Sequence, residues 1–139
     1  MIAVTPYIFD ASALLAYLKD ERGTEVVEEL LLHSDVPCFA HAVNICEVYY
    51  NILALAGERA ADSALAGLLS DGLTVREDLD PDMVAKAAHY KVGQQARRPI
   101  ADCFCLALAD RFNGEIVTAD HPDFDGIAES GECRVRFIR

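Results

Sequence analysis

The sequence of 139 residues contains no tryptophan, only five prolines and few basic residues. Lysine and arginine together number 12, against 23 aspartates and glutamates, which gives a formal net charge of −11. This charge disfavours broad nonspecific binding of nucleic acids, because the overall field repels phosphates. It does not exclude a metal-dependent nuclease, because carboxylates that bind a metal ion become locally neutral or positive once the ion is bound.

Long apolar runs are also missing from the sequence. No stretch approaches the roughly 18 apolar residues that are needed to cross a bilayer. The first residues, 1–6, lack the basic and apolar regions of a signal peptide. We therefore expect a cytoplasmic protein with no membrane segment. The length and the 53% of hydrophobic residues fit a single domain over residues 1–139.

The five cysteines are an odd number, and no two of them have the spacing of a zinc-binding pair. Their neighbours are mostly apolar, so we expect buried, reduced thiols. A catalytic cysteine is possible, but the histidines are scattered along the chain and none is indicated as the base for a thiol nucleophile.

Apolar runs of strand length alternate with helical patterns along the chain. The expected strands cover residues 7–9, 36–40, 73–76, 115–118 and 134–138. The expected helices cover residues 13–18, 26–31, 43–55, 60–69, 81 to about 93, and 100–112. Residues 119–124 read as a loop after the fourth strand. This alternation predicts an α/β fold with a mainly parallel central sheet flanked by helices.

Four acids occupy similar settings, at the mouth of a buried strand or within an apolar helix: Asp10, Glu47, Asp102 and Asp120. A carboxylate in such a setting is costly to desolvate unless a cation meets it. Ligands of parallel sheets gather beyond the carboxyl ends of the strands, where Asp10 and Asp120 are expected to lie. The four acids therefore predict an acidic pocket that binds a divalent metal ion.

Each acid also has a purely structural interpretation. Asp10 is equally suited to cap the helix that follows it, and Glu47 to lie on a solvated helix face with Asn44 and Asn51. Asp102 fits the first turn of a helix, and Asp120 fits a turn that contains proline.

Asp123 is either a fifth metal ligand or an acid of the same turn as Asp120. Thr118 adds a hydroxyl that can hold a carboxylate or a water molecule. Arg97 and Arg98, in a polar segment over residues 94–99, are the best local phosphate contacts, with a solvated basic turn as the alternative.

An all-oxygen ligand set favours Mg²⁺ or Mn²⁺ as the cofactor. Such ions hydrolyse phosphodiesters by activating water, either as a pair or as one ion assisted by a free carboxylate. The sequence leaves both arrangements open.

Four segments of the sequence together resemble the PIN domain and, within it, the VapC-type toxins of toxin–antitoxin pairs. The segments cover residues 8–14, 44–48, 100–109 and 116–124, in the order found in that family. The resemblance implies a three-layer PIN-like fold and a Mg²⁺- or Mn²⁺-dependent endoribonuclease that cleaves RNA with metal-activated water. It also implies metal-binding and catalytic roles for the four acids: Asp10, Glu47, Asp102 and Asp120.

The same resemblance implies support at the rim of the site from Ser12 and Thr118. VapC-like toxins commonly form homodimers and are silenced by a cognate antitoxin, whose tail enters or borders the acidic cleft. The expected partners are therefore an RNA substrate, an antitoxin and a second copy of the chain.

Three other functions fit parts of the sequence. A receiver-like phospho-acceptor domain has a similar length, but it needs paired acids after the first strand and a late lysine. An aspartate-nucleophile phosphatase needs a second aspartate where Ser12 stands. A noncatalytic binding module of the PIN fold remains the third alternative.

Overall fold

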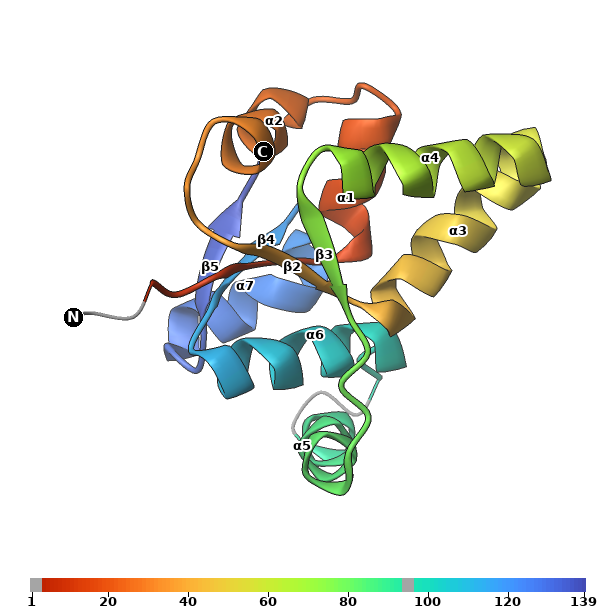
Figure 1. The fold of residues 1–139 in the computed structure, drawn as a ribbon. Helices are drawn as coiled ribbons and strands as arrows, with labels where there is room; N and C mark the ends of the chain where they lie inside the picture. The colour runs from red at the N-terminus through yellow and green to blue at the C-terminus, as the bar shows by residue number, and fades with distance from the viewer. Residues whose placement is uncertain (1–3, 94–96) are drawn as a thin grey trace.

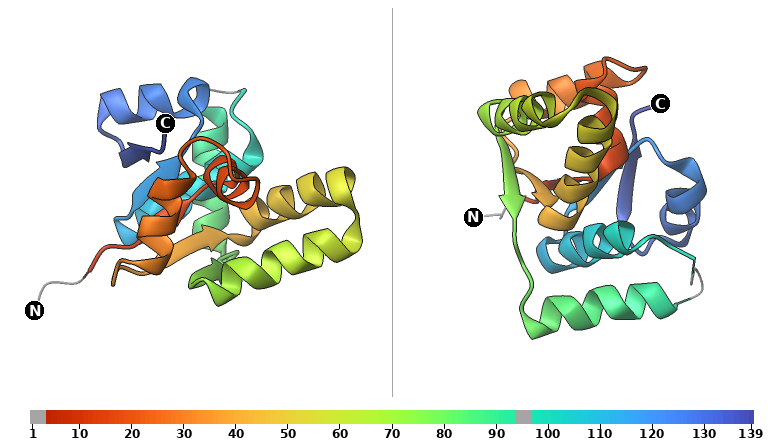
Figure 2. Two further views of the ribbon diagram at one scale, coloured as in Figure 1. Left: turned by 90° about the horizontal axis from the view of Figure 1, so that it is seen from above. Right: turned by 90° about the vertical axis from the view of Figure 1, so that its right-hand side faces the viewer.

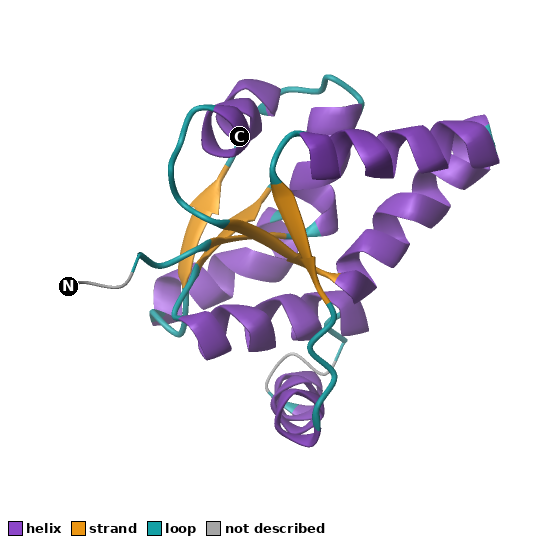
Figure 3. Cartoon of the chain, in the orientation of Figure 1, coloured by secondary structure: helices purple, strands orange, loops and turns teal. Residues whose placement is uncertain are grey.

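The computed structural model of the chain describes residues 4–93 and 97–139. Residues 94–96 of the polar segment that contains Arg97 and Arg98 therefore lie outside the described residues. Five strands form one sheet in the order β3-β2-β1-β4-β5, and each neighbouring pair is parallel (Figures 1 and 3). The strands are β1 (Tyr7–Phe9), β2 (Cys38–His41), β3 (Leu73–Arg76), β4 (Glu115–Thr118) and β5 (Arg134–Phe137). The expected α/β sheet is confirmed, and it is parallel throughout.

Seven helices connect and cover the strands in the described part of the chain, giving three layers (Figures 1 and 2). One face of the sheet carries α1 (Ala11–Leu18), α2 (Thr24–Leu32), α3 (Ala42–Ala56) and α4 (Glu58–Ser70). The other face carries α5 (Pro81–Val92), α6 (Ile100–Phe112) and α7 (His121–Ser130). In Figure 1, α6 lies against the sheet and α5 lies beyond α6.

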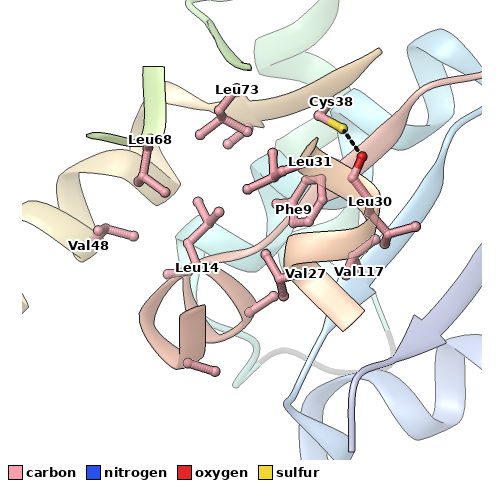
Figure 4. Packing of buried hydrophobic residues seen from close by; sticks show 14 of the residues in the cluster. Phe9, Leu14, Val27, Leu30, Leu31, Cys38, Val48, Leu68, Leu73 and Val117 are labelled. Carbon is pink, nitrogen blue, oxygen red and sulfur yellow. Dashed lines mark hydrogen bonds between the residues drawn. The ribbon is translucent and has the colours of Figure 1, made fainter. Parts of the chain in front are cut away.

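The sheet separates two apolar cores because successive strand residues point to opposite faces. In β1, Ile8 belongs to the core beneath α6, whereas Phe9 belongs to the core beneath α1 and α2. Both side chains are fully buried. Figure 4 shows the second of these cores, where Phe9 lies among Leu14, Val27 and Leu31. Burial on both faces explains why the central strands read as continuous apolar runs.

One helix was not expected from the sequence. Residues 119–124, which read as a loop, instead contain the start of α7. The side chain of Asp120 caps this helix by accepting a hydrogen bond from the backbone N–H of Asp123 at 3.1 Å. Pro122 lies in the first turn, where its missing N–H costs nothing. The loop interpretation is therefore wrong, and Asp120 and Asp123 belong to one helix start.

The paired helices α3 and α4 meet at Gly57 and extend away from the sheet (Figure 2). Gly57 has a φ of 92°, which residues with a Cβ rarely adopt, and it ends α3 and begins α4.

All five cysteines are free, and Cys46 on α3 is exposed, contrary to the expected burial.

The order of the strands creates a switch point at the centre of the sheet. From β1 the chain adds β2 and β3 on one side and later β4 and β5 on the other. The connections after β1 and β4 therefore diverge, and a crevice is expected where they separate, at the carboxyl ends of these strands. Asp10 follows β1 and Asp120 follows β4 closely, so both lie at this edge.

Among the helices of residues 4–93 and 97–139, none has the length and apolar character needed to span a membrane.

Candidate metal centre

Asp10 is buried, with 2% of its surface exposed, directly after β1. Its Oδ1 atom accepts a hydrogen bond from the backbone N–H of Ala13 at 3.0 Å, which caps α1. Its Oδ2 atom accepts a hydrogen bond from the hydroxyl of Thr118 at 2.5 Å. The capping interpretation of Asp10 is therefore confirmed. A carboxylate has about four acceptor positions, so capping does not use up its capacity for a cation.

Two hydroxyl groups hold the Asp10 carboxylate in place. The Ser12 hydroxyl donates to Oδ1 at 2.8 Å and accepts a hydrogen bond from the backbone N–H of Ala119 at 2.9 Å. The Thr118 hydroxyl accepts from the backbone N–H of Asp120 at 2.9 Å. The two hydroxyls thus join the start of α1 to the end of β4, the two sides of the crevice.

Burial raises the pKa of Asp10 to about 6, although the hydrogen bonds from Thr118, Ala13 and Ser12 lower it. The charge of Asp120 raises it further. Desolvation is therefore the largest effect, and a nearby cation would reverse it.

Three aspartates converge at the crevice. Asp102 on α6 and both Asp120 and Asp123 at the start of α7 place one carboxylate oxygen each so that the three lie within 4.8 Å of one another. Asp120 and Asp123 come together because the first lies at the cap and the second in the first turn of the same helix. Asp102 reaches them from the first turn of α6. Asp123, which the sequence left between ligand and turn residue, is one of the three.

The Asp102 carboxylate has the most unfavourable surroundings for a negative charge. The residue is 8% exposed, and its Oδ2 atom is buried without a hydrogen-bond partner among the described residues. Burial, the neighbouring Asp123 and the charge of Asp10 raise the pKa of Asp102 to about 8. Burial also raises the pKa of Asp120. Acids crowded in this way are stabilised either by protons or by a cation.

Glu47 lies on α3, outside the close group of three aspartates, and is half-buried. Burial raises its pKa, as do the charges of Asp120 and Asp123, so Glu47 faces the same field of negative charge. Glu47 is therefore half-buried rather than fully solvated, and its role as a ligand stays a prediction. Glu47 lies near enough to Asp120 and Asp123 for their charges to act on it, but it does not belong to the group whose oxygens all lie within 4.8 Å of one another.

Asn44, on the same helical stripe as Glu47, also belongs to the site. It lies one helical turn before Glu47, is 1% exposed, and its Nδ2 atom donates to the backbone carbonyl of Ala101 at 3.0 Å. It therefore ties the helix that carries Glu47 to the helix that carries Asp102. The only sign of this role in the sequence is its position three residues before Glu47, on the same face of the helix. A pattern along one helix does not reveal which other helix that face packs against.

The two arginines of the expected phosphate contact have different surroundings. Arg97 is exposed, whereas Arg98 is 8% exposed and lies between α5 and α6. One guanidinium nitrogen of Arg98 donates to the backbone carbonyl of Tyr90 at 3.3 Å. The solvated-turn alternative thus fits Arg97 but not Arg98.

The donor set of the crevice fits a hard divalent cation. The three close ligand groups are all carboxylates, which Mg²⁺ and Mn²⁺ prefer. Burial is the largest cause of the raised pKa values of Asp10, Asp102 and Asp120, and the Oδ2 atom of Asp102 has no hydrogen-bond partner among the described residues. Within the described structure, these carboxylates therefore lack a counter-charge that would offset their burial. A bound cation would supply it.

Comparison with known proteins links this architecture to one family. The sequence profile described as "PIN domain" matches residues 7–129. A search of the curated proteins finds no match to the sequence.

Three of the similar solved structures come from toxin–antitoxin systems. A toxin–antitoxin complex from Klebsiella pneumoniae is 17% identical, with 96% of this chain and 98% of that chain covered and a TM-score of 0.69. VapBC2 from Rickettsia felis, bound to a DNA fragment from its promoter, is 14% identical, with 94% and 97% covered and a TM-score of 0.74. VapC20 from Mycobacterium tuberculosis, a toxin that cleaves the sarcin–ricin loop, is 19% identical, with 87% and 94% covered and a TM-score of 0.69. At these identities the likeness establishes the fold.

Proposed function

This chain belongs to the PIN domain family, and on that premise we propose that it is a metal-dependent endoribonuclease. The observation that carries the proposal is the convergence of Asp102, Asp120 and Asp123, with ligand oxygens within 4.8 Å, at the switch point of the sheet. Carboxylates brought so close in a buried setting are unfavourable without a counter-charge, and in a crevice they are suited to a divalent ion.

In this proposal Mg²⁺ or Mn²⁺ is held by the three close aspartates, with Asp10 and Glu47 completing the acidic wall. The bound ion supplies Lewis-acid stabilisation of the phosphate oxygens and makes water a better nucleophile. Thr118 and Ser12 keep the Asp10 carboxylate from rotating, through hydrogen bonds of 2.5 and 2.8 Å. Asn44 keeps the Glu47 helix against the first turn of α6. Fixed ligands of this kind cost no reorganisation during the reaction.

The most direct test incubates the pure protein with total RNA, with and without Mn²⁺, and maps the ends of the products. We expect cuts only with Mn²⁺, and none from the Asp102→Asn variant. Attack by water does not use the ribose 2′-hydroxyl. A synthetic substrate with a 2′-deoxy sugar at the mapped cut should therefore still be cleaved, and no 2′,3′-cyclic phosphate should form. RNA that is bound but never cut would instead indicate a noncatalytic module.

The biological setting that we propose is a cytoplasmic toxin of a toxin–antitoxin pair. It is supported by the fold shared with VapBC2 and VapC20 over at least 87% of this chain. A cognate antitoxin and a homodimer are the partners that this setting requires. Expression of the chain alone should arrest growth in a host that lacks the antitoxin, and the Asp102→Asn variant should not. Light scattering of the pure protein tests the dimer.

A further inference from the structure

A cavity of about 570 Å³ lies between α5, α6 and α7. Lys86, His89 and Tyr90 line it from α5, Asp123 lines it from α7, and Arg98 lines it from the segment before α6. The volume is within the range of about 300–1,000 Å³ that is usual for ligand sites. Asp123 also belongs to the close group of aspartates, so the cavity adjoins the proposed metal centre.

Arg98 is a buried cation without a counter-ion. The residue is 8% exposed, and its Nε atom has no hydrogen-bond partner in residues 4–93 and 97–139. Four other arginines of the described chain form ion pairs with acids, whereas the one hydrogen bond of the Arg98 guanidinium among the described residues goes to the carbonyl of Tyr90. The backbone carbonyl of Arg98 accepts a hydrogen bond from the ammonium group of Lys91. Burying a guanidinium without a counter-charge is unfavourable. The absence of an acidic partner within the described ranges is notable because the chain has 23 aspartates and glutamates against 12 lysines and arginines.

The remaining charges of the cavity do not satisfy Arg98. Lys86 is paired with Asp110 at 2.8 Å, so these two side chains neutralise each other. Asp123 is part of the acidic group. Glu132, the third acid of the lining, is exposed and forms no ion pair with Arg98 within the part of the chain that the structure describes. The cavity therefore offers one buried, unpaired guanidinium next to the acids that are proposed to hold the ion.

We propose that this cavity is a phosphate subsite for the RNA strand, in which Arg98 binds a backbone phosphate next to the one that is cleaved. The proposal rests on the proposed endoribonuclease function and adds to it the place where the strand continues. A guanidinium matches a phosphate with two parallel hydrogen bonds, and this pairing is strongest where water is excluded. Because the chain carries a net charge of −11, a local cation at the site favours binding of the strand.

The test compares Arg98→Gln with Arg97→Gln, a matched control. Arg97 is the neighbouring residue, carries the same charge, is exposed and does not line the cavity. Binding of a fluorescein-labelled single-stranded RNA is measured by anisotropy in EDTA, where no divalent ion contributes. We expect Arg98→Gln to weaken binding about tenfold or more, as for a lost hydrogen bond to a charged group, and Arg97→Gln to weaken it much less. In Mn²⁺, Arg98→Gln should raise KM and leave kcat nearly unchanged.

A scan of neutral linkages tests the same subsite in the wild-type protein, which removes any concern that Arg98→Gln fails to fold. A methylphosphonate is introduced at one position of the RNA at a time. We expect a single position, next to the mapped cut, at which the neutral linkage weakens binding by the same factor as Arg98→Gln. With the RNA neutral at that position, the variant and the wild type should bind equally.

The outcomes separate this subsite from the proposed function. Equal RNA affinity of Arg98→Gln and Arg97→Gln would overturn the subsite even if the protein cleaves RNA, and so would a scan without a sensitive position. A carboxylate of a protein partner would then be the better candidate for the counter-ion of Arg98. RNA that binds through Arg98 but is never cleaved would support the subsite and refute the endoribonuclease.

Discussion

The hydroxyl of Thr118 donates a hydrogen bond of 2.5 Å to the carboxylate of Asp10. The two residues are 108 positions apart in sequence and lie at the ends of neighbouring parallel strands. The same hydroxyl accepts a hydrogen bond from the backbone N–H of Asp120 at 2.9 Å. One side chain thus fixes two of the acids at the switch point of the sheet.

We expect Thr118→Val to weaken Mn²⁺ binding and to lower the cleavage rate about tenfold, as for other residues that orient metal ligands. Valine keeps the shape of threonine but leaves the buried Asp10 carboxylate without one donor, which costs about 1.5–3 kcal/mol of stability. Calorimetric titration with Mn²⁺ and urea unfolding measure the two effects. Thr74→Val on β3, where the side chain is exposed, is the control and should change neither. Unchanged Mn²⁺ affinity in Thr118→Val would show that the hydroxyl has no role at the site.

Glu47→Gln tests whether the half-buried glutamate of α3 takes part in metal binding. We expect a weaker Mn²⁺ affinity and a lower rate, but a smaller loss of affinity than in Asp102→Asn, because Glu47 lies outside the close group of aspartates. The same titration on Glu29→Gln, an exposed glutamate of α2, provides the control. If Glu47→Gln binds Mn²⁺ as tightly as the wild type, Glu47 is not a ligand.

The stability of the metal-free protein should fall as the pH rises. Burial raises the pKa of Asp10 to about 6 and that of Asp102 to about 8, both above their unfolded value of 3.8. The folded protein therefore holds these protons more tightly than the unfolded chain. The resulting stabilisation is fully present below the unfolded pKa and is lost as the pH rises through the folded values.

Thermal unfolding in EDTA between pH 5 and pH 9 measures this effect. We expect the Tm to fall across the range and to fall less in Asp102→Asn, which has no charge to acquire at that position. Mn²⁺ should raise the Tm more at pH 8.5 than at pH 5.5, because protons compete for the same oxygens. A Tm that is constant or rises over this range in EDTA would contradict the crowding of the acids.

Much of this site was predictable from sequence because parallel strands share one geometry. Asp10 and Asp120 follow apolar strand-length runs, and the carboxyl ends of such strands meet at one edge of the sheet. The structure confirms that edge for both residues. Asp102 was predictable as an acid in the first turn of an apolar helix, a setting in which a carboxylate needs a partner.

Other features depend on how helices pack, which a local pattern does not encode. Asp123 joins the close group because α7 begins at His121, and that helix was mistaken for a loop although Asp120 and Pro122 mark its start. The approach of α3 to α6 depends on the contact from Asn44 to Ala101, 57 residues further along the chain. Arg98 is buried and bonds to Tyr90 of α5, while its neighbour Arg97 remains exposed.

The proposed function requires that the aspartates at the ends of β1 and β4 and on α6 together bind a divalent ion. Calorimetric titration of the wild type and of Asp102→Asn with Mn²⁺ at pH 8.5 tests it most directly, after circular dichroism has shown that both are folded. We predict saturable binding to the wild type and an affinity at least about tenfold weaker in the variant. Equal Mn²⁺ affinity in the two proteins would show that Asp102 is not part of a metal site.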